Sequence, residues 1–158
     1  MLKVLIAEDQ LLIADQLEEC LTASGYHVCG IARTVAEGVA LGELHKPDLA
    51  VLDVRLAKGD YGPEIAHRLN SRRNFGVLYA TGDDVRNSKL TLVDGDASIQ
   101  KPYRPEDVVL ALAIVREIVT TGMASLPFPR GFRMLQSPNS QLAKRVAAVQ
   151  HEKQGPSL

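Results

Sequence analysis

The chain is 158 residues long, 46% hydrophobic and 23% charged, with a net charge of −1. This length suits one buried core with an appendage and leaves little room for a second domain. The longest uninterrupted apolar run, Val108 to Val115, is far shorter than the ~20 residues of a membrane span, so we expect a soluble protein.

Five short apolar runs predict strands. Because they lack polar alternation, we expect each strand to be covered on both faces, as in a doubly wound parallel sheet. Helix-period segments separate the runs, which is typical of parallel strands joined by crossover helices. The predicted strands are Lys3–Ala7, His27–Ala32, Leu49–Val54, Gly76–Thr81 and Ala97–Gln100.

Five segments predict the helices that connect and follow these strands. Most have clear boundary signals, such as a capping Thr34 or a closing Gly25. One is weaker, because residues such as Asn87 and Ser88 have low helix propensity, and we expect it to be short or mobile. The predicted helices are Leu11–Ala23, Val35–Leu44, Pro63–Arg72, the weak segment Asp84–Leu92, and Pro105–Thr121.

The composition changes after Thr121. Residues 122–158 are rich in Pro, Gly and Ser and carry 5 Lys and Arg against 1 acidic residue, whereas residues 1–121 carry 13 against 18. One possible helix, Gln141 to His151, cannot by itself form a helix-turn-helix module. We therefore expect one domain over 1–121 and an extension over 122–158 without an output domain, and the charge pattern does not favour nucleic acid as a partner.

The first residues and the cysteines bear on cellular location. The segment before Glu8 has too few apolar residues for the core of a secretory signal. Cys20 and Cys29 have no CxxC spacing, so we interpret both as reduced thiols. These features predict a cytoplasmic protein.

Polar side chains follow four of the predicted strands at the point where each strand ends. They are Glu8 and Asp9, Asp53, Thr81, and Lys101. Ligands of open α/β sheets bind beyond the carboxyl ends of the strands, so we expect these residues to meet. Three carboxylates at about 4 to 5 Å would repel by about 3 to 4 kcal/mol per pair, which calls for a cation.

Mg²⁺ is the cation that suits this set best, because it binds a few carboxylates and accepts a phosphate oxygen of a substrate. A carboxylate beside Mg²⁺, an ammonium such as Lys101 and a hydroxyl such as Thr81 indicates phosphoryl transfer with the carboxylate as nucleophile.

These motifs resemble the receiver domain of two-component response regulators. The resemblance runs from residue 2 to about residue 121 and rests on "AED", "LAVLDV", "YATG" and "QKPY" in that order at strand ends. It implies a flavodoxin-like (βα)5 fold with strand order 2-1-3-4-5. It also implies a stand-alone response regulator, monomeric or weakly dimeric, that receives a phosphoryl group from a histidine kinase or histidine phosphotransfer protein and signals through a downstream protein rather than acting as a metabolic enzyme.

The resemblance also implies residue roles. Asp53 would be the phosphoacceptor, Glu8 and Asp9 the acidic pair at Mg²⁺, and the Arg55 backbone carbonyl a further metal ligand. Lys101 would contact the phosphate.

The resemblance implies two further features, and the chain departs from it at one position. Thr81 would bind a phosphoryl oxygen, and the Lys101–Pro102 peptide would be cis. The chain departs from the family at Ser98, because receivers commonly have an aromatic residue there whose rotation reports phosphorylation.

Two other functions compete with this interpretation. A haloacid-dehalogenase-type phosphatase also combines Asp, Thr, Lys and an acidic pair, but its nucleophile comes first in a DxD motif. Here the acidic pair comes first and position 55 is Arg. A phosphorylation-independent interaction module would not need the intact set of Glu8, Asp9, Asp53 and Lys101.

Overall fold

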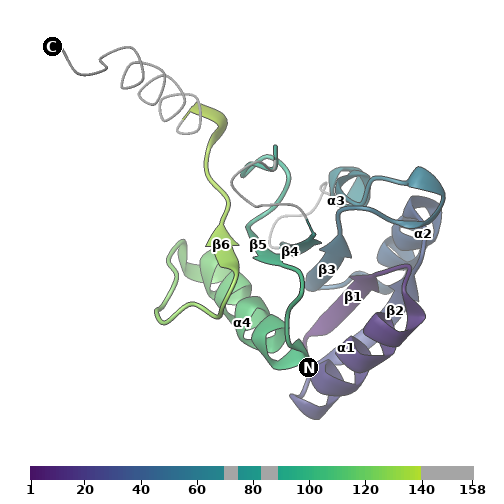
Figure 1. The fold of residues 1–158 in the computed structure, drawn as a ribbon, viewed down its shortest axis with the longest axis horizontal. Coiled ribbons are helices and arrows are strands. Elements are labelled where there is room, and N and C mark those ends of the chain that lie inside the picture. The colour runs from purple at the N-terminus through teal and green to yellow at the C-terminus, as the bar shows by residue number, and fades with distance from the viewer. Residues whose placement is uncertain (70–74, 83–88, 140–158) are drawn as a thin grey trace, which may run out of the picture.

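A parallel sheet with helices on both faces forms the body of the protein (Figure 1). The computed structural model describes residues 1–69, 75–82 and 89–139. The elements in these ranges are β1 Lys3–Ala7, α1 Leu11–Ala23, β2 His27–Ala32, α2 Val35–His45, β3 Leu49–Asp53, α3 Pro63–Leu69, β4 Gly76–Thr81, β5 Ala97–Gln100, α4 Pro105–Thr121 and β6 Phe132–Met134.

The strand order is β2-β1-β3-β4-β5-β6. β1 to β5 pair in parallel, which confirms the flavodoxin-like order 2-1-3-4-5. β6 adds a sixth, antiparallel strand at the β5 edge. The sequence analysis did not predict this strand.

The helices lie in two layers that follow the hydrophobic clusters. α1 and α4 pack on one face, where Leu17, Leu21, Leu112 and Val115 contact side chains of the sheet such as Ile6. α2 and α3 cover the other face, with the α3 residues Ile65 and Leu69 in the second cluster. The central strands are therefore covered on both sides, as their continuous apolar runs predict.

Local signals fix the helix ends. The Thr34 hydroxyl accepts a hydrogen bond from the Glu37 amide at 3.2 Å and caps α2. Glu106 and Asp107 lie in the first turn of α4, and Gly122, at a φ of 75°, ends that helix in the left-handed region that glycine tolerates. These boundaries agree with the predicted ones.

Some predicted elements differ from those in the structure. β3 ends at Asp53, one residue earlier than expected, and α2 continues to His45. α3 is described as far as Leu69, and the rest of the predicted helix lies outside the described residues. The weak helix over Asp84–Leu92 falls mostly on 83–88, also outside them, and Lys89–Leu92 is not helical.

The possible helix at Gln141–His151 likewise lies outside the described residues. No helix in the described ranges has both the length and the apolar content to cross a membrane. Cys20 and Cys29 are free thiols.

Candidate phosphorylation site

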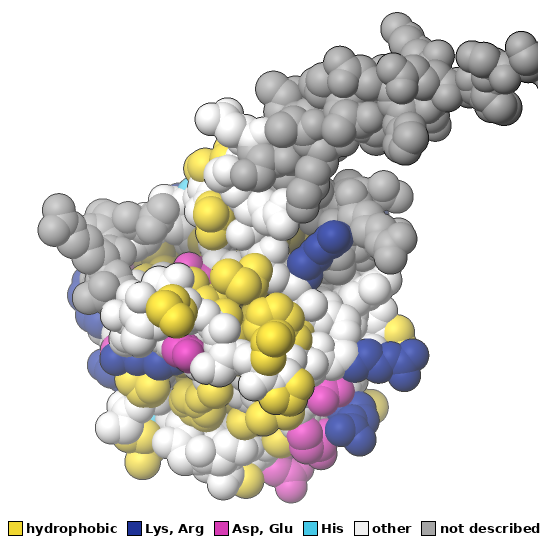
Figure 2. Space-filling model, turned by 90° about the vertical axis from the view of Figure 1, so that its left-hand side faces the viewer, with side chains coloured by type: hydrophobic (Ala, Val, Ile, Leu, Met, Phe, Trp, Pro, Cys, Tyr) yellow, Lys and Arg dark blue, Asp and Glu magenta, His cyan; other side chains and the backbone are white. Residues whose placement is uncertain are grey.

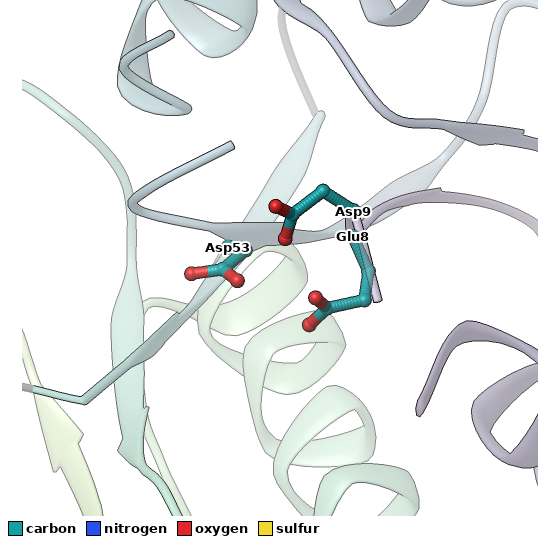
Figure 3. Close-up of side chains that lie close together, drawn as sticks. All are labelled: Glu8, Asp9 and Asp53. Carbon is teal, nitrogen blue, oxygen red and sulfur yellow. The ribbon is translucent and has the colours of Figure 1, made fainter. Parts of the chain in front are cut away.

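Three carboxylates converge where β1 and β3 end. β1 ends at Ala7, so Glu8 and Asp9 emerge from the sheet next to Asp53, the last residue of β3. Figure 3 shows the three side chains turned toward the space between them. One oxygen from each lies within 4.8 Å of the others, which is the arrangement that the strand ends predict.

Lys101 joins this cluster from the end of β5. Its Nζ donates to Asp53 Oδ2 at 2.7 Å and to Glu8 Oε2 at 3.0 Å. The side chains of Glu8 and Asp53 are 2% and 9% exposed. A single ammonium therefore partly neutralises two buried acids.

Backbone groups hold the site residues in place. The Gln10 amide donates to Glu8 Oε1 at 3.0 Å, and the Arg55 amide donates to Asp53 Oδ1 at 3.2 Å. The Lys101 amide donates to the Thr81 carbonyl at 2.8 Å, which ties β5 to β4 beside the site. The Lys101–Pro102 peptide is cis, as the resemblance implies.

The protonation of the site reflects its burial. Burial raises the pKa of Glu8, although hydrogen bonds from the Gln10 amide and Lys101 oppose the shift. Burial lowers the pKa of Lys101, but its hydrogen bonds to Asp53 and Glu8 outweigh that effect and raise it overall. Lys101 is therefore charged at neutral pH.

An open pocket lies over these groups. Thr81, which is 2% exposed, lines it together with Asp53 and Lys101. The remaining lining residues are Asp9, Gln10, Val54, Arg55, Leu56 and Gly82. All the residues predicted for the site thus lie in or beside one pocket, and Glu8 lies below it.

Two residues that contribute to the site, Gly62 and Tyr103, are not among those predicted from the sequence. Gly62 packs against the backbone of Asp53 so closely that a Cβ atom built on it would lie 1.8 Å from the Asp53 carbonyl oxygen. Its local sequence, "YGP", is typical of a turn and directly precedes α3, so it gives no sign of this contact. Tyr103 is the second: its buried hydroxyl has no hydrogen-bond partner among the described residues, and burial, with Glu8 and Asp53 nearby, raises its pKa.

The comparisons with known proteins agree with this geometry. The model of the response regulator receiver domain matches residues 4–113, and the chain belongs to that family of signalling proteins. The phosphatase alternative is not favoured.

Particular relatives illustrate the match. The transcriptional regulatory protein PdtaR of Mycobacterium tuberculosis is 36% identical over 122 residues, covering 73% of this chain and 59% of PdtaR. The phyllosphere-induced regulator PhyR of Methylorubrum extorquens is 32% identical, covering 67% of this chain and 40% of PhyR. The chain thus spans about half the length of these relatives.

A solved structure shows the same fold. The CheY-like receiver domain protein of Methanospirillum hungatei is 27% identical, covers 78% of this chain and 99% of its own, and superposes with a TM-score of 0.68.

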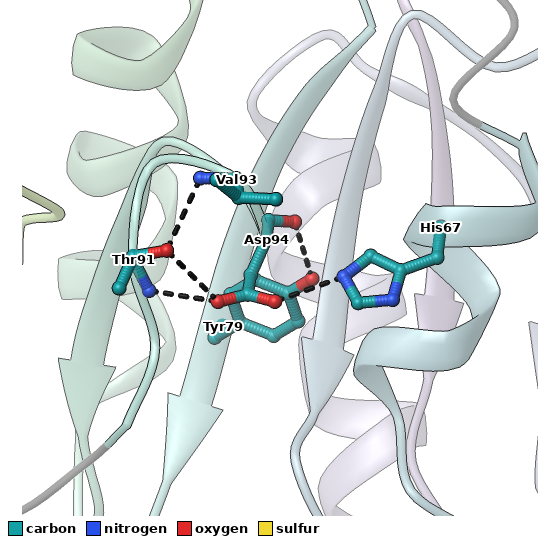
Figure 4. A network of polar contacts seen from close by, with 5 residues as sticks. All are labelled: His67, Tyr79, Thr91, Val93 and Asp94. Atoms are coloured by element: carbon teal, nitrogen blue, oxygen red, sulfur yellow. Dashed lines mark hydrogen bonds and ion pairs between the residues drawn. The ribbon is translucent and has the colours of Figure 1, made fainter. Parts of the chain in front are cut away.

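A second polar network ties β4 to α3 (Figure 4). The Tyr79 hydroxyl donates to the Asp94 carbonyl at 2.6 Å, and the Asp94 carboxylate contacts His67 Nε2 at 2.8 Å and accepts from the Thr91 amide at 2.8 Å. Tyr79 is fully buried. The network fixes the segment that leads into β5.

We expect Tyr79→Phe to lower the free energy of unfolding by about 1 kcal/mol, because it removes the hydroxyl that pairs with the Asp94 carbonyl. Urea unfolding followed by circular dichroism measures the change. Tyr61→Phe is the matched control, since Tyr61 is 47% exposed and should change stability by less than about 0.5 kcal/mol. Equal losses in both variants would contradict the role assigned to this bond.

Proposed function

We propose that the chain is a response regulator that accepts a phosphoryl group on Asp53 from a histidine kinase or a histidine phosphotransfer protein. The observation that carries this proposal is the Asp53 carboxylate itself. It lies at the floor of an open pocket, beside the Lys101 ammonium at 2.7 Å and two further carboxylates. A nucleophilic carboxylate next to fixed positive charge is what phosphoryl transfer requires.

The proposed transfer forms one bond to phosphorus and breaks one. A carboxylate oxygen of Asp53 forms a bond to phosphorus while the bond from phosphorus to the donor histidine nitrogen breaks, and that nitrogen retains the bonding electrons. Lys101 stabilises the charge on one phosphoryl oxygen, and the Thr81 hydroxyl binds another. Thr81 ends β4, the neighbour of β3, and Lys101 follows β5, the next strand along. Both side chains are held by the sheet, so positioning supplies most of the catalysis.

The donor set suits a bound Mg²⁺. Glu8, Asp9 and Asp53 offer hard carboxylate oxygens within 4.8 Å of one another, and the Arg55 carbonyl would complete the protein ligands. When bound, Mg²⁺ neutralises the carboxylates and the transferred phosphoryl group.

We infer that the protein acts by binding other proteins and has only self-catalysed phosphoryl transfer and hydrolysis of its own. A monomer or weak dimer in the cytoplasm is consistent with this role, and the two free thiols support that location. The downstream partner is a protein that distinguishes the phosphorylated form.

Phosphotransfer profiling tests the proposal. Each purified histidine kinase of the host is labelled with radioactive ATP and mixed with the protein and Mg²⁺ for a short time. We expect rapid label transfer from one kinase or phosphotransfer protein. Transfer from none of them, together with no modification by acetyl phosphate, would overturn the assignment.

We expect Mg²⁺ to raise the melting temperature. At a concentration about tenfold above its Kd, one bound ion stabilises the folded state by about 1.4 kcal/mol, or about 3 to 6 °C. The shift should shrink as the pH is lowered through the pKa of Glu8, which burial raises above its ordinary value, because protons then compete with the metal. Differential scanning fluorimetry with and without EDTA measures it.

Asp9→Asn tests the ligand assignment, because it removes one carboxylate of the set. Asp15→Asn, an exposed substitution on α1, is its control. An unchanged shift in Asp9→Asn would argue against this metal site.

A further inference from the structure

The extension beyond α4 returns to the sheet and caps the β5 edge (Figure 1). Residues Arg130–Gln136, which we name the C-terminal strap, include β6. The first hydrogen bond along the strap runs from the Gln100 amide to the Gly131 carbonyl at 3.1 Å. Near its other end the Leu135 amide donates to the Asp96 carbonyl at 3.0 Å, and the Gln136 carbonyl accepts from the Leu92 amide at 3.1 Å. Between them Ala97 faces Met134 and Ile99 faces Phe132.

Few apolar contacts hold the strap. Leu135 is 6% exposed and belongs to the cluster that contains Tyr79 and Leu90, and Phe132 is half-buried against the opposite cluster. Figure 2 shows hydrophobic side chains gathered on the face that α4 and the connection into β6 present to solvent. On this connection Leu126 is 77% exposed. A three-residue edge strand with one buried anchor, Leu135, exposes less apolar surface on opening than a central strand does, so it opens locally at lower cost.

The strap is linked directly to the candidate phosphorylation site. Gln100, which pairs with Gly131, is followed by Lys101, whose ammonium contacts Asp53 Oδ2 at 2.7 Å. A phosphoryl group on Asp53 would take the space in which this contact lies, so the Lys101 ammonium would shift to a phosphoryl oxygen. Because Gln100 directly precedes Lys101, a displacement of the Lys101 backbone would act on the bond between Gln100 and the strap.

Ser98 weakens the closed arrangement. It is fully buried, faces Arg133 of the strap, and its hydroxyl has no hydrogen-bond partner among the described residues. A buried hydroxyl without a partner destabilises the state that contains it. Release of the strap, whose Arg133 lies opposite Ser98, would open a route for water to this hydroxyl and relieve the destabilisation.

We propose that the C-terminal strap is an autoinhibitory strand: it leaves β5 when Asp53 is phosphorylated, and the vacated edge accepts an extended strand from a partner protein. The proposal rests on the proposed function for its trigger. The partner strand needs a large apolar side chain at the position of Leu135, because this is the strap residue that the core buries.

Hydrogen exchange on the full chain tests release. Beryllofluoride with Mg²⁺ serves as the phosphoryl mimic, and ¹⁹F NMR reports its uptake. We expect the amides of residues 131–136 to exchange about tenfold faster or more in the loaded protein, while those of β1 do not change. Unchanged exchange of the strap in protein that has taken up beryllofluoride overturns strap release alone. Absence of uptake overturns the proposed function and the trigger with it.

The coupling between strap and site is reciprocal, which supplies a second test. If beryllofluoride binding loosens the strap, then loosening the strap must tighten beryllofluoride binding. Leu135→Ala weakens the strap and should tighten beryllofluoride binding about threefold or more by ¹⁹F titration. Leu126→Ala, an exposed truncation in the same extension, is the matched control and should leave the affinity unchanged. Equal affinities for the two variants and the unaltered chain overturn the coupling.

A disulfide between β5 and β6 would hold the strap in place, which is the opposite of the effect of Leu135→Ala. Ala97→Cys and Met134→Cys place thiols on directly opposed residues of β5 and β6, within disulfide reach of an antiparallel pair. Cys20 and Cys29 are replaced by Ser in the same chain. We expect the oxidised form to bind beryllofluoride more weakly than its own reduced form. Equal binding in the two forms contradicts the proposal.

Discussion

Replacing Asp53 with Asn is expected to abolish phosphorylation by acetyl phosphate. The amide cannot act as the carboxylate nucleophile, although its oxygen can still accept a hydrogen bond from Lys101, whose second partner Glu8 is unchanged. We therefore expect a folded protein without the modification. Intact mass spectrometry after incubation with acetyl phosphate and Mg²⁺ measures the fraction that gains one phosphoryl group.

The Asp15→Asn variant is the control for this experiment as well, because it removes an exposed carboxylate of α1 that does not belong to the carboxylate group of the site. It should be modified to the same extent as the unaltered protein. Modification of Asp53→Asn at the unaltered level would show that another residue is the acceptor.

Gly62→Ala is expected to destabilise the protein by about 2 to 4 kcal/mol. The new Cβ would lie 1.8 Å from the Asp53 carbonyl oxygen and 2.9 Å from its carbon. Both are backbone atoms of a central strand and cannot rotate away as a side chain could. The Gly62 amide also donates to the Val54 carbonyl at 2.8 Å, so the loop cannot retreat without losing that bond.

Urea unfolding measures this loss. Gly82→Ala is the matched control, since no atom of the described residues beyond its chain neighbours lies within 4 Å of its added Cβ, and its change should stay within about 0.5 kcal/mol. If the two variants unfold at the same urea concentration, the close packing of Gly62 under the acceptor strand is not important for stability. If Gly62→Ala folds but reacts more slowly with acetyl phosphate, the contact also positions Asp53.

Most of the sheet could be predicted from the sequence, because strands that are buried on both faces consist of continuous apolar residues. Runs such as Leu49–Asp53, all buried, have no polar residue to interrupt them until Asp53, the candidate phosphoacceptor. The sequence did not reveal β6, since its three residues follow a segment rich in Pro and Gly that indicates loops. Its pairing depends on the open edge of β5, which is a property of the folded sheet.

The candidate site was predictable to the extent that its residues end strands. Glu8, Asp9, Asp53 and Lys101 meet because parallel strands bring their carboxyl ends to one edge. Gly62 could not be identified in this way. It contributes through the close approach of its backbone to that of Asp53, and this approach exists only once the loop has folded against the strand. The lack of a hydrogen-bond partner for the buried hydroxyls of Ser98 and Tyr103 among the described residues could not be predicted either, since the partners of a polar group are known only after packing.

The antiparallel β6 has a consequence for solubility. An uncovered β5 would present unpaired amides and carbonyls to any other chain and so invite aggregation. β6 ends the sheet with a very short strand that has the exposed Arg133 at its centre, and Pro127 and Pro129 precede it. Such a strand is a poor template for further pairing. Variants that loosen it should therefore precipitate sooner at high protein concentration, which makes the extension a solubility element of the fold.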